Sequence, residues 1–367
     1  MKILVTGSDG FVGKNLIARL KENGHTVYQF ARSNNENELR NFVNESDFIF
    51  HLAGENRATD DNDFVKNNTK LTSILCNSIF ATGRGIPVVY TSTIHVTSNS
   101  PYGDSKLLAE KEIIKLAENS QNRVYIYRLP GVFGKWSKPN YNSVVATFCH
   151  NIANELPINI RDEEHLLNLV YIDDVVEEFC KKITLDISEP VQQSVEPVYS
   201  ISLGALASQI YSFKESRETL ITENVGNGLI RKLHATYLSY LPKDKFTYKV
   251  PLHADQRGTF VELVKTPLNG QFSYFTAGVG VTRGGHYHHT KTEKFIVVQG
   301  RARFRFVNIQ SLEEHEVYVD GKFPEVVETI PGWWHDITNI GEDQLIAFLW
   351  ANEIFNPTMP DTYSKDM

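Results

Sequence analysis

Cysteine is scarce in this chain, which has three cysteines among its 367 residues. Cys76, Cys149 and Cys180 lie far apart and form no Cys-x-x-Cys pair, so we expect neither a disulfide framework nor a cysteine-based zinc or redox motif. Such usage is typical of a reducing cytoplasm, where cysteines pack as small apolar side chains. We therefore expect a cytoplasmic protein.

Long hydrophobic runs and an excess of positive charge are also missing. No apolar stretch approaches bilayer-spanning length, and a β-prone run begins at once, so we expect neither membrane insertion nor a signal peptide. The net charge of −7 gives no whole-chain reason to expect binding to nucleic acid or to an anionic membrane. With 41% apolar residues, a chain of this length can bury two cores, and two domains are expected.

The N-terminus carries the first motif. The apolar run 1–6 (MKILVT) meets a glycine turn, and residues 11–23 then place apolar side chains at helical spacing. In a dinucleotide-binding unit, Gly7 would allow the tight turn and Gly10 the approach of a pyrophosphate to the helix N-terminus. Gly13 would allow close packing of helix on strand. An ordinary glycine-rich turn is the alternative.

The next predicted strand, 26–30 (TVYQF), ends without a carboxylate. Sites that choose NAD usually place Asp or Glu here to bind the ribose 2′-OH, whereas this chain has Arg32. A guanidinium suits a 2′-phosphate, so we expect NADP(H); a solvated surface arginine is the alternative. Further predicted strands at 47–53, 88–91 and 124–129 alternate with helical runs, which predicts an α/β fold with a parallel, doubly wound sheet.

Tyr102 and Lys106 lie one helical turn apart and share a face. A neighbouring ammonium favours the phenolate and should lower the tyrosine pKa, so that the tyrosine can deliver a proton to a carbonyl oxygen while a nicotinamide gives hydride to the carbon. The same spacing recurs at Tyr287 and Tyr318. Only Tyr102 follows a strand that ends in Ser/Thr, whose hydroxyls can polarise the same carbonyl.

These pieces resemble the extended short-chain dehydrogenase/reductase family, especially its sugar-nucleotide epimerases, dehydratases and reductases. The matching pieces stand in family order across the first half: TGSDGFVG (6–13), HLAG (51–54), Asn68, TST (91–93), YGDSK (102–106), RLPGVFG (128–134) and VYIDDV (170–175). The resemblance implies a catalytic triad of Thr93, Tyr102 and Lys106; the family more often has Ser at the first position, and Ser92 is the fallback. It also implies a cofactor site made of Gly7, Gly10, Phe11, Val12, Gly13, Arg32, Leu52, Ala53, Tyr102 and Lys106.

The segment 134–142 (GKWSKPNYN) follows the last cofactor-binding strand. It offers cations for a diphosphate, amides for sugar or base edges and aromatic rings for stacking, although a polar surface loop is the alternative. In the family this region holds the nucleotide sugar, which implies substrate binding by Lys135, Asn140 and Asn142; Arg128, at the end of the preceding strand, is a further expected substrate residue. The pair Asp173-Asp174 stands at a helix start, where carboxylates more often complement the helix dipole than bind metal.

The sequence pattern changes near residue 245. Apolar and polar residues then alternate, as in 301–306 (RARFRF), and Gly, Pro and Asn recur at short intervals. This pattern predicts about a dozen short strands in a barrel or jelly roll. We therefore expect an NADP(H)-binding domain over 1–244 and an all-β domain over 245–367.

Four candidate metal ligands gather in the second domain: His286, His288, Glu293 and His335. Residues two apart in a strand point the same way, so the first two can share an inward face and, with the others, form a three-histidine, one-carboxylate site for Zn, Fe, Mn or Ni. The spacing resembles the two-part cupin motif, Gly-x5-His-x-His-x4-Glu-x6-Gly followed by Pro-Gly-x2-His-x3-Asn. We expect a divalent metal, zinc before the others; the alternative is that no metal binds.

A second resemblance competes with the first. Asp255-x-Arg257-Gly-x-Phe-x-Glu262 and Arg283-Gly-Gly-His286-Tyr resemble the sugar-nucleotide 3,5-epimerase branch of the cupins, which works without metal and uses His as a base beside a 4-keto sugar. This implies His286 as catalytic base and Arg283 as a substrate residue. A metal-bound imidazole cannot remove a proton, so His286 has two competing roles. If it is a ligand, the metal can polarise the ketone instead.

The domain order, together with a C-terminal PDTY (360–363), closely resembles a family of bacterial enzymes of capsular polysaccharide synthesis over essentially the whole chain. The resemblance implies C3-epimerisation in the cupin and then NADPH-dependent C4-reduction of a UDP-4-keto-6-deoxy-HexNAc. The product would be a UDP-N-acetyl-L-6-deoxytalosamine-type precursor of N-acetyl-L-fucosamine.

Two alternatives to this bifunctional enzyme stay open. One is a plain NADPH-dependent sugar-nucleotide reductase with a non-catalytic cupin. The other is an NADP(H) sensor without turnover, against which Tyr102 and Lys106 argue. Cupins often form dimers through their edge strands, and this pairing covers backbone N–H and C=O groups that would otherwise have no partner. We therefore expect a homodimer.

Overall fold

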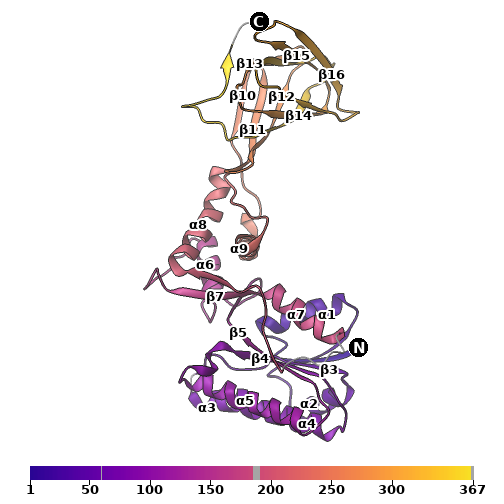
Figure 1. Cartoon of the computed structure of the whole chain (residues 1–367), viewed down its shortest axis with the longest axis vertical. Helices are drawn as coiled ribbons and strands as arrows, with labels where there is room; N and C mark the ends of the chain where they lie inside the picture. The colour runs from indigo at the N-terminus through magenta and orange to yellow at the C-terminus, as the bar shows by residue number, and fades with distance from the viewer. Residues whose placement is uncertain (59, 185–190, 365–367) are drawn as a thin grey trace. The chain divides into compact units, whose positions relative to one another are not determined.

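The computed structural model describes residues 1–58, 60–184 and 191–364. By its internal contacts the chain divides into two compact units. The N-terminal unit consists of Met1–Ile210 and Arg231–Leu241, and the C-terminal unit of Tyr211–Ile230 and Pro242–Met367. The predicted boundary at 244/245 stays a prediction; the last passage between the units falls at Leu241–Pro242, and an earlier segment also belongs to the C-terminal unit. The elements are numbered in chain order, and Figure 1 labels many of them.

The N-terminal unit contains a six-stranded sheet of order β2-β1-β3-β4-β5-β8, in which all neighbours are parallel. Its strands are β1 (Lys2–Thr6), β2 (Thr26–Phe30), β3 (Phe48–His51), β4 (Val88–Thr93), β5 (Val124–Leu129) and β8 (Gln192–Gln193). The chain moves outward from β1 to β2 and then returns past β1 to β3. The direction of winding therefore reverses between β1 and β3, and ligands of such sheets bind outside the carboxyl ends at this point.

Helices cover both faces of this sheet, as a parallel sheet requires. The first face carries α1 (Phe11–Glu22) and α7 (Ile172–Thr184), the second α2 (Glu36–Glu45), α4 (Leu71–Ala81) and α5 (Pro101–Glu118). Because side chains alternate along a strand, Ile3 and Val5 of β1 pack in one core and Leu4 in the other. No helix among the described residues is long and apolar enough to span a membrane.

The remaining elements before the C-terminal sheets complete the unit and lead to the next. They are α3 (Asp61–Phe64), the π-helical turn η1 (Val65–Lys70), η2 (Ile94–Thr97), β6 (Gly131–Phe133), α6 (Val144–Ala153), β7 (Leu166–Tyr171), β9 (Tyr199–Ser202), α8 (Leu203–Thr219), α9 (Gly228–Leu238) and η3 (Lys243–Lys245). Strands β6, β7 and β9 form a small separate sheet.

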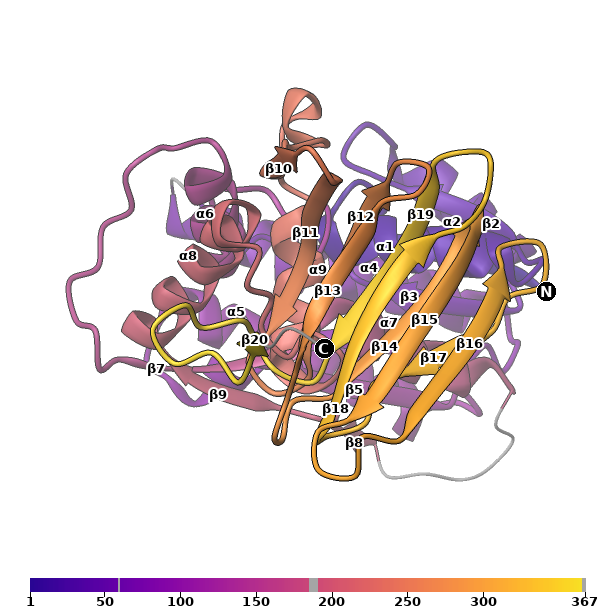
Figure 2. The same ribbon diagram turned by 90° about the horizontal axis from the view of Figure 1, so that it is seen from above.

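The C-terminal unit is built from two antiparallel sheets (Figure 2). The first has the order β10 (Leu252–Asp255), β11 (Gly258–Thr266), β12 (Gly270–Ala277), β19 (Leu345–Ala351), β14 (Glu293–Gln299) and β17 (Val326–Glu328). The second has the order β16 (Glu314–Asp320), β15 (Arg301–Asn308), β18 (Trp333–Asn339), β13 (Thr282–Tyr287) and β20 (Tyr363–Ser364).

One hydrophobic core joins these two sheets. Phe275 and Phe295 come from the first sheet, and Phe304 and Ile337 come from the second. The predicted fold class, a Rossmann-type parallel sheet followed by an all-β jelly roll, is confirmed.

Candidate functional sites

The glycine turn between β1 and α1 has no room for side chains. Gly7 has a φ of +67°, and a Cβ there would lie 2.7 Å from the backbone nitrogen of Ala53; a Cβ on Gly13 would collide with the Gly7 carbonyl oxygen. Gly10 is the N-cap of α1 and brings no capping side chain, so the first backbone N–H groups of the helix are available to an anion. The turn therefore fits a bound pyrophosphate. Phe11 and Val12 open the helix, and both are half-buried.

Arg32 follows β2, and its guanidinium forms an ion pair with Glu55. The Glu55 side chain is 9% exposed and also accepts a hydrogen bond from the Tyr141 hydroxyl at 3.3 Å. The backbone of Glu55 is fixed by Asn68, whose side-chain oxygen accepts from Glu55 N at 2.7 Å. Sequence reasoning missed Glu55, although it directly follows the HLAG piece. A 2′-phosphate on Arg32 would compete with this carboxylate.

The three residues of the predicted catalytic triad lie on two neighbouring elements. Thr93 is the last residue of β4, and Tyr102 and Lys106 lie in the first turns of α5, whose start is set by the Ser100 N-cap and by Pro101. Lys106 is buried, and its ammonium donates to the Thr91 carbonyl at 2.6 Å. Burial lowers the pKa of Lys106 to about 7, with Glu110 opposing the shift.

The expected fall in the pKa of Tyr102 is not found. Burial raises this pKa, and the hydrogen bond to Thr93 offsets the rise only in part. The sequence argument relied on the Lys106 ammonium, which instead bonds to Thr91. A phenol that stays protonated at neutral pH is nevertheless the form that donates a proton to a carbonyl oxygen.

A buried hydrogen-bond chain links the ends of β1 and β3 to Asn68. The Thr72 hydroxyl donates to Asn68 O at 2.6 Å, so it must accept from Nε2–H of His51, 2.8 Å away. Nδ1 of His51 then accepts from the Thr6 hydroxyl at 2.7 Å. Burial lowers the pKa of His51 to about 3, which keeps the ring neutral as this arrangement requires. Sequence reasoning named Asn68 but missed the chain, because its members are adjacent only in the fold.

The residues predicted to bind substrate each have a protein partner or face solvent. Arg128 makes a two-pronged ion pair with the buried carboxylate of Glu110, at 3.0 and 2.7 Å. Lys135 pairs with Asp173 at 2.7 Å. The Asn140 amide lies 3.5 Å from Asn151 Oδ1, and Asn142 is exposed.

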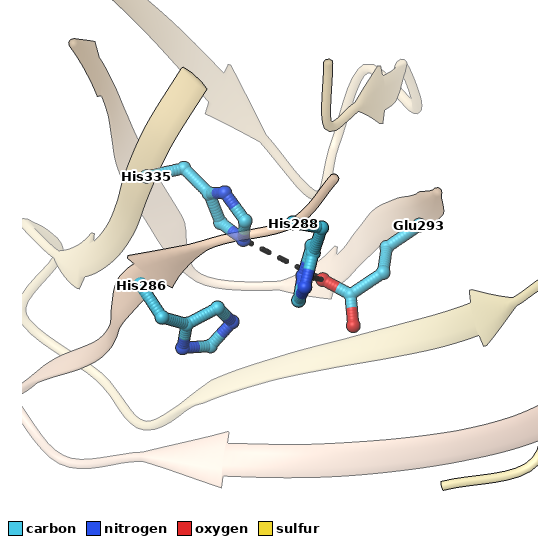
Figure 3. Close-up of side chains that lie close together, drawn as sticks. All are labelled: His286, His288, Glu293 and His335. Atoms are coloured by element: carbon cyan, nitrogen blue, oxygen red, sulfur yellow. Dashed lines mark hydrogen bonds and ion pairs between the residues drawn. The ribbon is translucent and has the colours of Figure 1, made fainter. Parts of the chain in front are cut away.

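Four side chains converge in the C-terminal unit, as Figure 3 shows. Glu293 opens β14 and His335 lies in β18, where it pairs with His286 of β13; His288 directly follows β13. One ligand atom from each of the four lies within 4.8 Å of the others. Glu293 Oε2 is 3.3 Å from His288 Nε2 and 3.5 Å from His335 Nε2.

The electrostatics of this cluster fit a divalent cation. Burial and the neighbouring histidines lower the pKa of His286 to about 4, so its ring is neutral. Burial opposes ionisation of Glu293, but the neighbouring His288 and His335 and the Lys291 ammonium hold its pKa well below the ordinary range. His335 Nε2 is buried and makes no hydrogen bond within the described part of the chain. Three imidazoles, an ionised carboxylate and a buried ring nitrogen without a hydrogen bond together form a ligand set typical of zinc.

The cluster borders a cavity of about 220 Å³ between the two sheets. Aromatic side chains such as Phe260 and Phe304 line it together with two arginines. Arg283 donates to Thr276 O at 3.3 Å, and Arg257 is held by Asp255 at 2.6 Å. The cavity therefore combines an apolar lining, two cations and the ligand cluster. Sequence reasoning proposed Arg283 but gave Arg257 no role, although it stands in the quoted DxRG motif.

Comparison with known proteins finds a matching family for each of the two parts of the chain. Residues 3–188 match the NAD dependent epimerase/dehydratase family, and residues 253–363 match the polysaccharide biosynthesis C-terminal domain. The chain is 52% identical over 365 residues to the UDP-2-acetamido-2,6-beta-L-arabino-hexul-4-ose reductase of Pseudomonas aeruginosa. The aligned residues cover 99% of this chain and 98% of the relative.

Solved structures agree with this assignment. The capsular polysaccharide assembling protein CapF from Staphylococcus aureus superposes with a TM-score of 0.93 at 40% identity, over 100% of both chains. The UDP-glucose 4-epimerase of Thermotoga maritima covers 65% of this chain and 98% of its own, with a TM-score of 0.57 at 17% identity, which supports the fold alone. The resemblance to enzymes of capsular polysaccharide synthesis is confirmed.

Proposed function

Because the chain belongs to the NAD-dependent epimerase/dehydratase family, we propose that it is a sugar-nucleotide reductase of surface polysaccharide synthesis that also epimerises its substrate. The Pseudomonas relative is named as a reductase of a UDP-linked 2-acetamido-hexul-4-ose, and the Staphylococcus relative as a capsular polysaccharide assembling protein. The proposed substrate is a UDP-4-keto-6-deoxy-HexNAc. The proposed product is a UDP-N-acetyl-L-6-deoxytalosamine-type precursor of N-acetyl-L-fucosamine.

The reduction is assigned to the N-terminal unit. When bound, NADPH supplies hydride to C4 of the sugar. Tyr102 donates its phenolic proton to the C4 oxygen, and the Thr93 hydroxyl, already bonded to Tyr102, orients that phenol. Lys106 holds the Thr91 carbonyl at the end of β4 and so fixes the strand that carries Thr93. The observation that carries this assignment is the placement of Thr93, Tyr102 and Lys106 at the carboxyl edge of the sheet, where the glycine turn also lies.

The choice of NADPH over NADH depends on Arg32, since no carboxylate ends β2. Its partner Glu55 is the feature that argues against a simple 2′-phosphate site, because Arg32 must exchange that carboxylate for phosphate. Binding of NADPH and of NADH, compared by quenching of protein fluorescence, tests the preference directly. Tighter binding of NADH than of NADPH would reverse it.

The epimerisation is assigned to the C-terminal cavity. The C4 ketone acidifies the C3–H, so removal and return of one proton inverts C3. His286, His288, Glu293 and His335 would hold a zinc ion, which, when bound, supplies a Lewis acid beside the ketone. Arg257 and Arg283 supply cations for the diphosphate, because guanidinium groups bind phosphate through paired charge-assisted hydrogen bonds.

Proton exchange in D2O tests this second step. The UDP-4-keto sugar is incubated with the full chain without NADPH, and its C3 proton is followed by NMR. Loss of the signal faster than without protein is the result expected. Exchange at the rate of the no-protein sample would leave a plain reductase with a non-catalytic cupin, provided that NADPH is still consumed when added.

The same exchange experiment separates the two roles of His286. If His286 is a metal ligand, removal of metal with a chelator stops the exchange and added Zn²⁺ restores it. If His286 is the base itself, the chelated protein keeps exchanging.

The remaining alternative is an NADP(H) sensor without turnover. It predicts that bound NADPH is never oxidised by the 4-keto substrate. The half-buried Tyr102 and its neighbour, the buried Thr93, favour catalysis, because a sensor has no need for a proton donor.

We also propose a homodimer. In the first sheet of the C-terminal unit, Phe272 and Phe348 stack at 5.4 Å on the face opposite to the core, and Phe272 is 37% exposed. Light scattering during gel filtration would distinguish a dimer from a monomer.

A further inference from the structure

The C-terminal segment 361–364 closes the loop that joins two of the candidate ligands. This loop runs from His288 to Glu293. The Asp361 carboxylate accepts from His289 N at 2.9 Å with one oxygen. With the other oxygen it accepts from Thr290 N at 2.6 Å, from the Thr290 hydroxyl at 2.9 Å and from Lys291 N at 2.8 Å. One carboxylate therefore satisfies three successive backbone N–H groups that neither strand pairs.

The main chain of Asp361 acts on a ligand directly. Its carbonyl oxygen lies 2.5 Å from Nδ1 of His288. A carbonyl can only accept, so Nδ1 must carry the proton, and Nε2 is the ring nitrogen that remains to bind a metal. Nε2 is the atom that faces Glu293 Oε2 at 3.3 Å. The segment thus selects the tautomer of His288 that can bind a metal.

Two further contacts hold the segment in place. Strand β20 pairs with β13, where Ser364 lies opposite His286 and Tyr363 opposite Tyr287. The rings of Tyr363 and Tyr287 stack with centroids 5.4 Å apart. The segment is therefore an added strand fixed beside the ligands, and Asp361 is its contact with the ligand loop.

We propose that Asp361 is a positioning residue for the metal cluster: it holds the His288–Glu293 loop and the His288 ring in the binding geometry before metal arrives. This inference rests on the proposed metal site. Groups outside the ligand set that orient a metal-bound histidine typically contribute 10- to 100-fold in affinity. Asp361 lies within the PDTY motif (360–363), and the sequence alone predicts no role for it.

The experiment measures Co²⁺ affinity of the full chain after removal of metal. Wild type, Asp361→Ala and Asp320→Ala are titrated against a competing chelator, and the visible absorption of bound Co²⁺ is recorded. Asp320 is a matched control, because it caps a turn through Lys322 N at the end of β16. We expect Asp361→Ala to bind Co²⁺ roughly 10-fold or more weakly, with a changed spectrum, and Asp320→Ala to match wild type.

Asp361→Asn supplies a graded test. The side-chain amide keeps one oxygen that can accept a hydrogen bond, but its NH2 group faces backbone N–H groups and cannot accept from them. We therefore expect an affinity between wild type and Asp361→Ala. Thermal unfolding of the metal-free proteins reports whether each variant folds. Should Asp361→Ala fail to fold, Tyr363→Ala replaces it, since this 44% exposed ring holds the segment from outside.

The outcomes separate the inference from the proposed function. Wild-type affinity and spectrum in Asp361→Ala, or in a folded Tyr363→Ala, would overturn the role of Asp361 and leave the metal site standing. A wild-type chain that binds no Co²⁺ would remove the metal site and the inference together, while NADPH oxidation still tests the reductase.

Discussion

The Lys106 ammonium of α5 donates a hydrogen bond to the Thr91 carbonyl of β4 at 2.6 Å, inside a core where burial lowers its pKa from 10.5 to about 7. The folded protein therefore loses this proton near neutrality, whereas the unfolded chain keeps it to about pH 10. Stability rises with pH wherever the unfolded state binds more protons.

From this we predict the pH dependence of a variant. Between about pH 7 and 10 the free energy of unfolding of wild type should rise relative to that of Lys106→Met, by up to about 1.4 kcal/mol per pH unit. Urea unfolding at several pH values measures the difference, in which groups common to both proteins cancel. Parallel pH profiles would show that Lys106 does not lose its proton in this range.

Tyr102→Phe removes the proposed proton donor and little else. We expect the rate of NADPH oxidation with the 4-keto substrate to fall roughly 100- to 10,000-fold, the usual contribution of a positioned acid. NADPH binding, followed by fluorescence, should be unchanged. A variant within a few-fold of wild type in turnover would refute the assignment.

Arg32→Ala tests the cofactor preference. Loss of a charged contact to a phosphate costs about 1.5–3 kcal/mol, so NADPH should bind roughly 10- to 100-fold more weakly while NADH binding stays the same. The control is Arg19→Ala, an arginine on α1 that pairs with Glu22 near the surface. Equal weakening of NADPH and NADH would indicate that Arg32 supports the fold rather than the 2′-phosphate.

Glu55→Gln is the complementary change. It removes the carboxylate that competes for Arg32 but keeps the size of the side chain, so we expect tighter NADPH binding and unchanged NADH binding. Titration of the variant with each cofactor measures the ratio. Weaker NADPH binding would mean that Glu55 organises the site instead of competing within it.

His335→Ala should abolish metal binding and C3 exchange together. The matched control is His315→Ala, an exposed histidine of β16 in the same unit. Bound metal measured by elemental analysis and C3 exchange measured in D2O should both fall to background in the first variant and stay at wild-type levels in the second. Exchange that survives without metal would support a metal-free epimerase with His286 as base.

Local patterns predicted the parts of the fold that depend on neighbours in sequence. The turn from Gly7 to Gly13 was predictable because its geometry is set by glycines a few residues apart. The convergence of His286, Glu293 and His335 was predictable only through spacing within a recognised motif, since β18 is distant in the chain from β13 and β14.

Properties set by tertiary contacts could not be read from the sequence. The direction of the Tyr102 pKa shift depends on burial under the folded chain, and Arg128 finds Glu110 only once β5 lies beside α5. Glu55 and Asp361 lie outside any periodic pattern. Their partners, Arg32 and the loop 289–291, are brought to them by the fold.

The C-terminal unit includes residues 211–230, which lie far upstream of its first strand. Within the unit, Lys265 N donates to Leu220 O and Lys265 O accepts from Thr222 N, both at 2.7 Å. A fragment expressed from residue 245 would lose these partners and expose one edge of β11. Dissecting the two proposed activities by truncation would therefore damage the half it was meant to isolate, and point variants of the full chain are the sounder tool.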